Sequence, residues 1–162
     1  MSDTMTHEAM LDAISSALET GGDSDAAMEA ALALLLETFD CPVGTIHTLD
    51  PATGMLKLRA LRGIPPSILD KVRMIPIGKG MAGIAAERMQ PVQVCNLQTD
   101  SSGVAKPAAK DTKMEGSISV PMLVDGKLRG TLGVAKPIPY EFSDNESSVL
   151  LDAGRLIGSF LK

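Results

Sequence analysis

Two cysteines and two histidines are the side chains in this 162-residue chain best suited to redox, nucleophilic or metal chemistry. Cys41 and Cys95 have no CxxC neighbour, and His47 has no second histidine close to it. A metal site in a protein needs several such ligands at short spacing. The pattern therefore predicts no metal centre, and it favours a small buried thiol at Cys95 over a reactive one.

The segment Gly78–Gly83 (GKGMAG) matches the GxGxxG pattern of dinucleotide-binding turns. Such a turn normally follows the first strand of a parallel βαβ unit, whereas two predicted helices and a predicted hairpin precede this one. Asp100, at the distance of the acidic partner, lies in a polar segment. We interpret the glycines as a tight turn that starts a helix. No Walker A or GxSxG pattern is present, and we predict no cofactor.

Helical spacing of apolar residues predicts a helix over residues 7–20, ended by Gly21-Gly22, and a second over 24–40, capped by Ser24. The second helix has almost no polar face. A helix of that kind is buried on more than one side. One side would cover a sheet, and the other would meet the first helix, the last helix or a partner subunit.

Further along the chain the spacing changes to period two and then returns to helical spacing. The predicted elements are strands over 43–50, 54–62, 74–77, 91–97, 117–124 and 127–136, short helices over 67–72 and 80–89, and a final helix begun by the capping box of Ser143 and Glu146. In residues 54–62, Leu56, Leu58 and Ala60 are expected to face one way and Lys57 and Arg59 the other. Hairpins flanked by helices predict an α+β fold with an antiparallel sheet.

The last predicted hairpin, which turns at Asp125-Gly126, has two different faces. One face is apolar and is expected to pack under the helices. The other carries small and hydroxyl side chains, which leave volume and supply hydrogen bonds for a small ligand. Thr45 and His47 are expected on this second face, and the polar segment 98–115 is expected to cover it. A sheet face wetted by solvent is the alternative explanation for the same pattern.

Charge is unevenly distributed along the chain, whose net charge is −5. Residues 1–42 contain nine acidic side chains and no lysine or arginine, which argues against contact with nucleic acid or an anionic membrane. Basic residues further on lack the interleaved aromatic residues of a nucleic-acid surface. The polar first residues and the lack of a long apolar run predict a cytoplasmic protein without a signal or membrane span.

The run from Ile75 to Leu97 resembles the GAF family, which has a similar glycine-rich turn, short helix, proline and strand. The resemblance continues through Ser117–Pro121, Gly126–Gly133 (GKLRGTLG) and the helix start at Phe142, and it covers about residues 24–160. The length of the chain and the lack of a linker or repeat predict a single domain over 1–162, and the resemblance implies an antiparallel sheet of five to six strands. The N- and C-terminal helices would lie on one face, and a ligand pocket would lie under loops on the other.

This resemblance implies a non-catalytic sensor module of signal transduction that binds a small-molecule effector. It also implies a homodimer formed through helices 24–40 and 144–161. The predicted ligand contacts are Met81, Asn96, Asp111, Lys113, Ser117, Ser119 and Thr131.

Two alternatives remain open at this point. One is a dimerisation or interaction module without a ligand. The other is a redox enzyme like the free methionine-R-sulfoxide reductase of the same family, using Cys95. That enzyme has cysteines near the position of Ala82 and within the loop that corresponds to residues 104–111, and this chain has none there.

Overall fold

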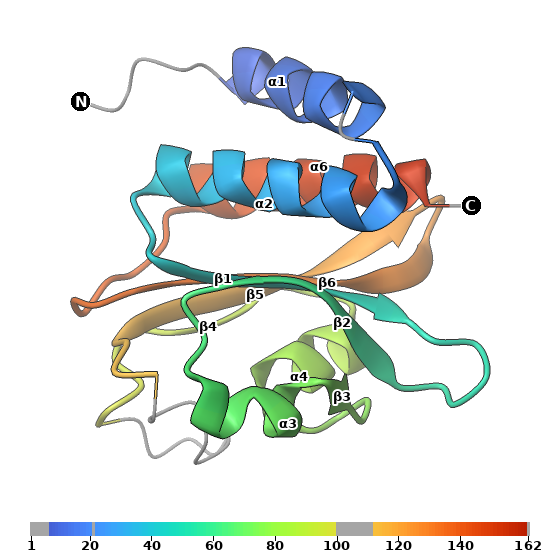
Figure 1. Ribbon diagram of the computed structural model, residues 1–162. Helices are drawn as coiled ribbons and strands as arrows, with labels where there is room; N and C mark the ends of the chain where they lie inside the picture. The colour runs from blue at the N-terminus through green and yellow to red at the C-terminus, as the bar shows by residue number, and fades with distance from the viewer. Residues whose placement is uncertain (1–6, 21, 100–111, 162) are drawn as a thin grey trace.

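An antiparallel sheet forms the centre of the structure (Figure 1). The structure is a computed structural model and describes residues 7–20, 22–99 and 112–161. The strands of the described residues lie in the order β3-β2-β1-β6-β5-β4. The turn between β5 and β6 has positive φ at both Asp125 and Gly126, which matches the right-handed twist of a hairpin. The strands are β1 (Val43–Leu49), β2 (Leu56–Arg62), β3 (Met74–Ile75), β4 (Val92–Val94), β5 (Gly116–Val124) and β6 (Lys127–Lys136).

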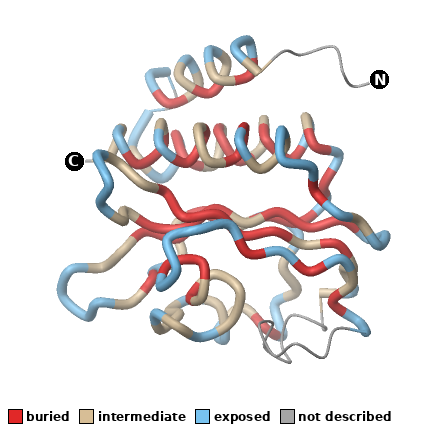
Figure 2. The backbone as a smooth tube through the Cα atoms, turned by 180° about the vertical axis from the view of Figure 1, so that it is seen from behind, coloured by how far each residue is buried: buried red, intermediate tan, exposed pale blue. Residues whose placement is uncertain are grey.

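Three long helices cover one face of this sheet in two layers (Figure 1). Helices α2 (Ser24–Phe39) and α6 (Asp144–Phe160) lie directly on the sheet, and α1 (His7–Thr20) packs across the outer side of both. Figure 2 shows the buried residues of α1 on its inner side. The prediction that the second helix is buried on two sides is confirmed, with the sheet below it and α1 above.

Helices α2 and α6 are capped at their N-termini by side-chain oxygens, which accept hydrogen bonds from backbone N–H groups of the first turn. At α6 the predicted capping box of Ser143 and Glu146 is confirmed. At α2 the predicted cap is wrong, because Asp23 accepts the Ala26 N–H at 2.8 Å. Ser24 is instead the first helical residue, and its hydroxyl accepts a hydrogen bond from Arg59.

The expected alternation of β2 is also wrong beyond Leu58. Ile46 pairs with Ala60 and His47 pairs with Leu58, so Arg59 is an extra residue in the ladder. Directly paired residues share a face of the sheet, so Ala60 lies on the helix side with Ile46, and Leu58 on the opposite side with His47. The Arg59 guanidinium reaches Asp25 at 2.8 Å and thereby ties β2 to the start of α2.

The opposite face of the sheet is partly covered by shorter elements, namely η1 (Pro66–Ile68), α3 (Leu69–Val72) and α4 (Gly80–Arg88) (Figure 1). The glycine motif is the predicted tight turn and helix start. Gly78 has a φ of +90°, and its N–H donates to the Gly83 carbonyl at 2.8 Å. A side chain at Gly83 would place its Cβ 2.4 Å from the Pro76 carbonyl oxygen, so backbone packing accounts for that glycine.

Candidate ligand-binding site

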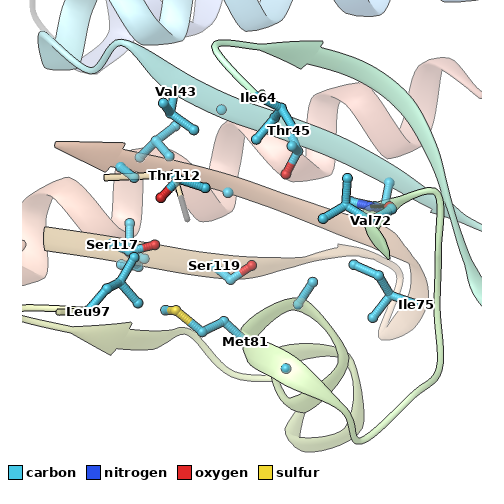
Figure 3. A pocket seen from close by; sticks show the side chains of 18 of the residues that line it. Val43, Thr45, Ile64, Val72, Ile75, Met81, Leu97, Thr112, Ser117 and Ser119 are labelled. Atoms are coloured by element: carbon cyan, nitrogen blue, oxygen red, sulfur yellow. Dashed lines mark hydrogen bonds between the residues drawn. The ribbon is translucent and has the colours of Figure 1, made fainter. Parts of the chain in front are cut away.

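A cavity of about 500 Å³ lies on the sheet face opposite α2 and α6 (Figure 3). Most of its lining is apolar, with a few hydroxyl, imidazole and ammonium groups, which is the usual make-up of a small-molecule site. The described residues that line it are Val43, Gly44, Thr45, His47, Ile64, Ile68, Lys71, Val72, Ile75, Lys79, Gly80, Met81, Ala82, Leu97, Thr112, Ser117, Ile118, Ser119, Gly133, Val134 and Ala135.

Three neighbouring strands form the floor of this cavity. Gly133 of β6 pairs with Thr45 of β1 on one side and with Ser119 of β5 on the other. Figure 3 shows the Thr45 and Ser119 hydroxyls directed into the cavity from its two sides. Neither hydroxyl makes a hydrogen bond with another described residue. The floor is therefore a bare glycine between two hydroxyls that are free to bind a ligand.

His47 also lines the cavity and is only 2% exposed. Its Nε2 lies 2.8 Å from the Val72 carbonyl oxygen, and a carbonyl can only accept, so Nε2 carries the proton. Burial lowers the pKa of His47, and the hydrogen bond to Val72 only partly opposes this. The neutral ring then has Nδ1 as an acceptor, and Nδ1 is buried without a partner among the described residues.

The charged side chains among the described lining residues have one sign. Lys71 of α3 and Lys79, just before α4, line its edge and are exposed. The described lining residues include no aspartate or glutamate. A cationic ligand would therefore find no counter-charge in this lining, whereas an anionic one would.

The structure brings together three of the seven residues predicted as ligand contacts. Met81, Ser117 and Ser119 line the cavity. Thr131 pairs with His47 and so shares the face, but it is 1% exposed and lies outside the lining.

The other predicted contacts come from the segment expected to cover the site. Asn96 is not in the lining, and its side-chain oxygen accepts the Gln98 N–H at 3.0 Å. Lys113 is exposed outside the lining, and Asp111 lies outside the described residues. Binding by any of the seven residues stays a prediction.

Several lining residues were not predicted as contacts. Thr45 and Gly133 could have been found from the period-two pattern, because they share the face of Ser117 and Ser119. Lys71 and Lys79 carried no such signal, because their place depends on how the segment between β2 and α4 folds back over the sheet.

Neither cysteine of the chain lines the cavity. Cys95 follows β4 and is exposed, so the prediction of a buried thiol at this position is wrong. Cys41 is buried in the helix-side core, where burial raises its pKa to about 11. A thiol with that pKa stays protonated near neutral pH and is a poor nucleophile. The cavity therefore has no thiol with which to reduce a ligand.

The described residues show neither a cluster of metal ligands nor a helix suited to a membrane. They contain no group of three or more histidine, cysteine, aspartate or glutamate side chains placed to hold a metal ion. None of the helices found among them has both the length and the apolar character needed to cross a bilayer.

Comparison with known proteins gives matches at the level of family and fold. A family model described as GAF domain matches residues 22–162. A comparison with curated protein sequences found no match.

Solved structures show the same fold. The GAF domain from a phosphoenolpyruvate-protein phosphotransferase of Coxiella burnetii has a TM-score of 0.82 at 17% identity, covering 96% of this chain and 92% of that one. Free methionine-R-sulfoxide reductase from Neisseria meningitidis in complex with its substrate has a TM-score of 0.78 at 19% identity, covering 95% and 87%. The fRMsr of Staphylococcus aureus in complex with substrate has a TM-score of 0.76 at 24% identity, covering 98% and 97%.

Proposed function

The chain belongs to the GAF domain family, and from this premise we propose that it is a non-catalytic sensor that binds a small-molecule effector in the cavity between the sheet and α3 and α4. Binding would change the relative populations of two states of the domain and so pass on a signal.

The observation that carries this proposal is the cavity itself. Its volume of about 500 Å³ lies within the range of small-ligand sites, and its mostly apolar lining includes a few polar groups. Two of these polar groups, Thr45 and Ser119, have hydroxyls with no partner in the described protein. Because α3 and α4 partly cover this face of the sheet, it is not simply a face wetted by solvent.

An enzyme of the sulfoxide-reductase type is less well supported by the same cavity. Such a reaction needs a thiol to attack the sulfoxide and a second thiol to resolve the product. Cys41 is buried on the other side of the sheet, and Cys95 is exposed outside the cavity. An interaction module without a ligand is the remaining alternative, and an empty cavity would support it.

We further propose that the domain works as a homodimer in the cytoplasm. Because α1 covers the outer side of α2 and α6, the dimer would use the parts of these helices that α1 leaves free, or α1 itself. Ala33 and Leu34 on α2 are half-buried apolar residues that could join such a contact. Two cysteines without a disulfide are compatible with a reducing compartment.

Native mass spectrometry of protein purified from its own host tests both parts of this proposal. We expect a dimer with a discrete added mass on each subunit. Ser117→Leu should fill part of the cavity and remove the added mass, whereas the control Ala52→Leu, exposed in the turn between β1 and β2, should retain it. An added mass that survives Ser117→Leu would contradict binding in this cavity. A wild-type dimer with no added mass would favour the interaction module.

A further inference from the structure

We propose that the effector of this cavity is a small planar organic anion that also carries an O–H or N–H donor. Its flat part would lie on Gly133 between Thr45 and Ser119, its donor would meet Nδ1 of His47, and its anionic end would face Lys71 and Lys79. This inference rests on the proposed function, because it specifies the ligand of the same site.

No backbone strain and no close contact within the described protein requires a glycine at position 133. Its φ lies outside the left-handed region, so its backbone suits any residue. An added Cβ would lie 3.4 Å from the Ser119 hydroxyl oxygen and 3.5 Å from that of Thr45, which are ordinary contacts. Glycine inside a strand often marks a bulge, a tight bend, or the close approach of a ligand or another backbone, and the pairing register is continuous at Gly133 on both sides.

At two other strand glycines, Gly44 and Gly130, close contacts within the protein do exclude a side chain. At Gly44 an added Cβ would lie 2.7 Å from a methyl of Leu36, because α2 packs closely there. At Gly130 it would lie 2.0 Å from the His47 carbonyl oxygen. Packing accounts for both of those glycines, and it does not account for Gly133. A flat group lying on the strand would.

His47 has a buried hydrogen-bond acceptor, Nδ1, that is unsatisfied within the described protein. Because Nε2 donates to the Val72 carbonyl, Nδ1 can only accept, and it has no partner among the described residues. Leaving a buried acceptor unpaired is costly, and a ligand donor would remove that cost. His47 lines the cavity but Nδ1 is buried, so the side chains beside it must adjust for the donor to reach it. The ligand is thereby selected for an O–H or N–H group.

The charged side chains of the described lining are all cationic. Lys71 and Lys79 supply two cations, and the described lining supplies no carboxylate. Gly80, the first residue of α4, also lines the cavity, so the positive end of that helix adds to the same field. These charges favour an anionic ligand over a neutral one and disfavour an ammonium group.

Four benzene derivatives of similar size separate these requirements when titrated by calorimetry into the full chain. The probes are 4-hydroxybenzoate (anion with donor), 4-methoxybenzoate (anion without donor), 4-hydroxybenzamide (the neutral counterpart) and tyramine (a cation with donor). We expect 4-hydroxybenzoate to bind most tightly. Loss of the phenolic donor should weaken binding roughly tenfold or more, and loss of the carboxylate by up to about fivefold, because the lysines are exposed. Tyramine should bind most weakly.

Gly133→Ala is the most direct test of the floor. The added methyl fits the protein, so thermal stability should be retained while 4-hydroxybenzoate affinity falls roughly tenfold or more, because a flat group can no longer lie on the strand. The matched control is Gly126→Asn, in the β5–β6 turn. There an added Cβ meets open space, and asparagine tolerates the positive φ. This variant should bind as the wild type does.

The outcomes separate this inference from the proposed function. Equal affinity for tyramine, or unchanged affinity in Gly133→Ala, would overturn the inference. So would a retained ligand in the mass spectrum that is cationic or has no donor, and the sensor function would then still stand. If none of the four probes binds and no mass is retained, both proposals fail.

Discussion

The substitution Ile14→Ala tests how firmly helix α1 is docked on the rest of the domain. This helix precedes the segment that matches the family model, yet three of its side chains belong to the hydrophobic core. Ile14 is 0% exposed, with Met10 and Leu18 buried one turn away on either side. Outside this apolar stripe, His7 pairs with Asp152 at 2.9 Å, and both side chains are about one-third exposed. The stripe therefore supplies most of the docking free energy.

The expected loss of stability has an upper limit set by this docking. Replacing a fully buried isoleucine by alanine typically costs about 2–5 kcal/mol. Burial of these three side chains contributes roughly 1.5–3 kcal/mol each to docking. The entropy cost of ordering a 14-residue helix, which is only marginally stable alone, must be subtracted from that gain. The net docking free energy is then only a few kcal/mol. We expect Ile14→Ala to cost about 2–4 kcal/mol and to leave α1 undocked from an intact sheet.

The assay combines urea unfolding with amide hydrogen exchange of residues 7–20. In Ile14→Ala these amides should exchange fast while those of β1, β5 and β6 stay protected. Adding Leu18→Ala should then cost little more, because the helix is already undocked. Ile157→Ala in α6 is the control, since it should destabilise the whole domain without selective exchange in α1. Fully additive losses at Ile14 and Leu18, or protected α1 amides in Ile14→Ala, would refute this reasoning.

Three further predictions concern thiols, pH and a helix cap. A thiol reagent should label Cys95 at once in the native protein and Cys41 only after unfolding, because Cys41 is buried and its pKa is about 11; two fast thiols would contradict this. Burial lowers the pKa of His47 below its unfolded value of about 6.5, so stability should be full above pH 6.5 and decline as pH falls further. Urea midpoints at pH 7.5 and 5.5 should show a smaller decline in His47→Gln, whose amide can still donate to Val72 but does not titrate. Asp23→Ala should lower the unfolding free energy by about 1 kcal/mol in a urea titration, and Asp23→Asn, which can still cap, by much less.

A helix or hairpin of this fold could be predicted where a single local pattern, such as an apolar stripe, a capping box or a turn dipeptide, determines it. The apolar stripe of residues 7–20 and the capping box at Ser143 located two helices, and Asp125-Gly126 located a hairpin. The cap of α2 was misplaced because Asp23 and Ser24 are equally good caps by type, and only the direction of the incoming chain decides between them. The side of Ala60 was missed because a bulge has no reliable signature in a single sequence.

The site was predictable only as far as strand alternation reaches. Ser117 and Ser119 followed from the period of β5, and the cavity contains them. The side of the site formed by Lys71, Val72 and Lys79 depends on tertiary folding of short segments and could not be predicted. The exposure of Cys95 could have been predicted from the same alternation, because Val92 and Val94 are buried, Gln93 is exposed, and Cys95 continues the exposed side.

Along β5, residues under selection for core packing alternate with residues under selection for ligand recognition. Ile118, Val120 and Met122 belong to the core under the helices, while Ser117 and Ser119 face the cavity. A mutation at a cavity position changes what can be recognised without removing a core contact, and a mutation at a core position has the opposite effect. Ligand preference can therefore drift through evolution while the fold persists. For the same reason, a library randomised at residues 117 and 119 alone is a sound starting point for redirecting this domain to a new ligand.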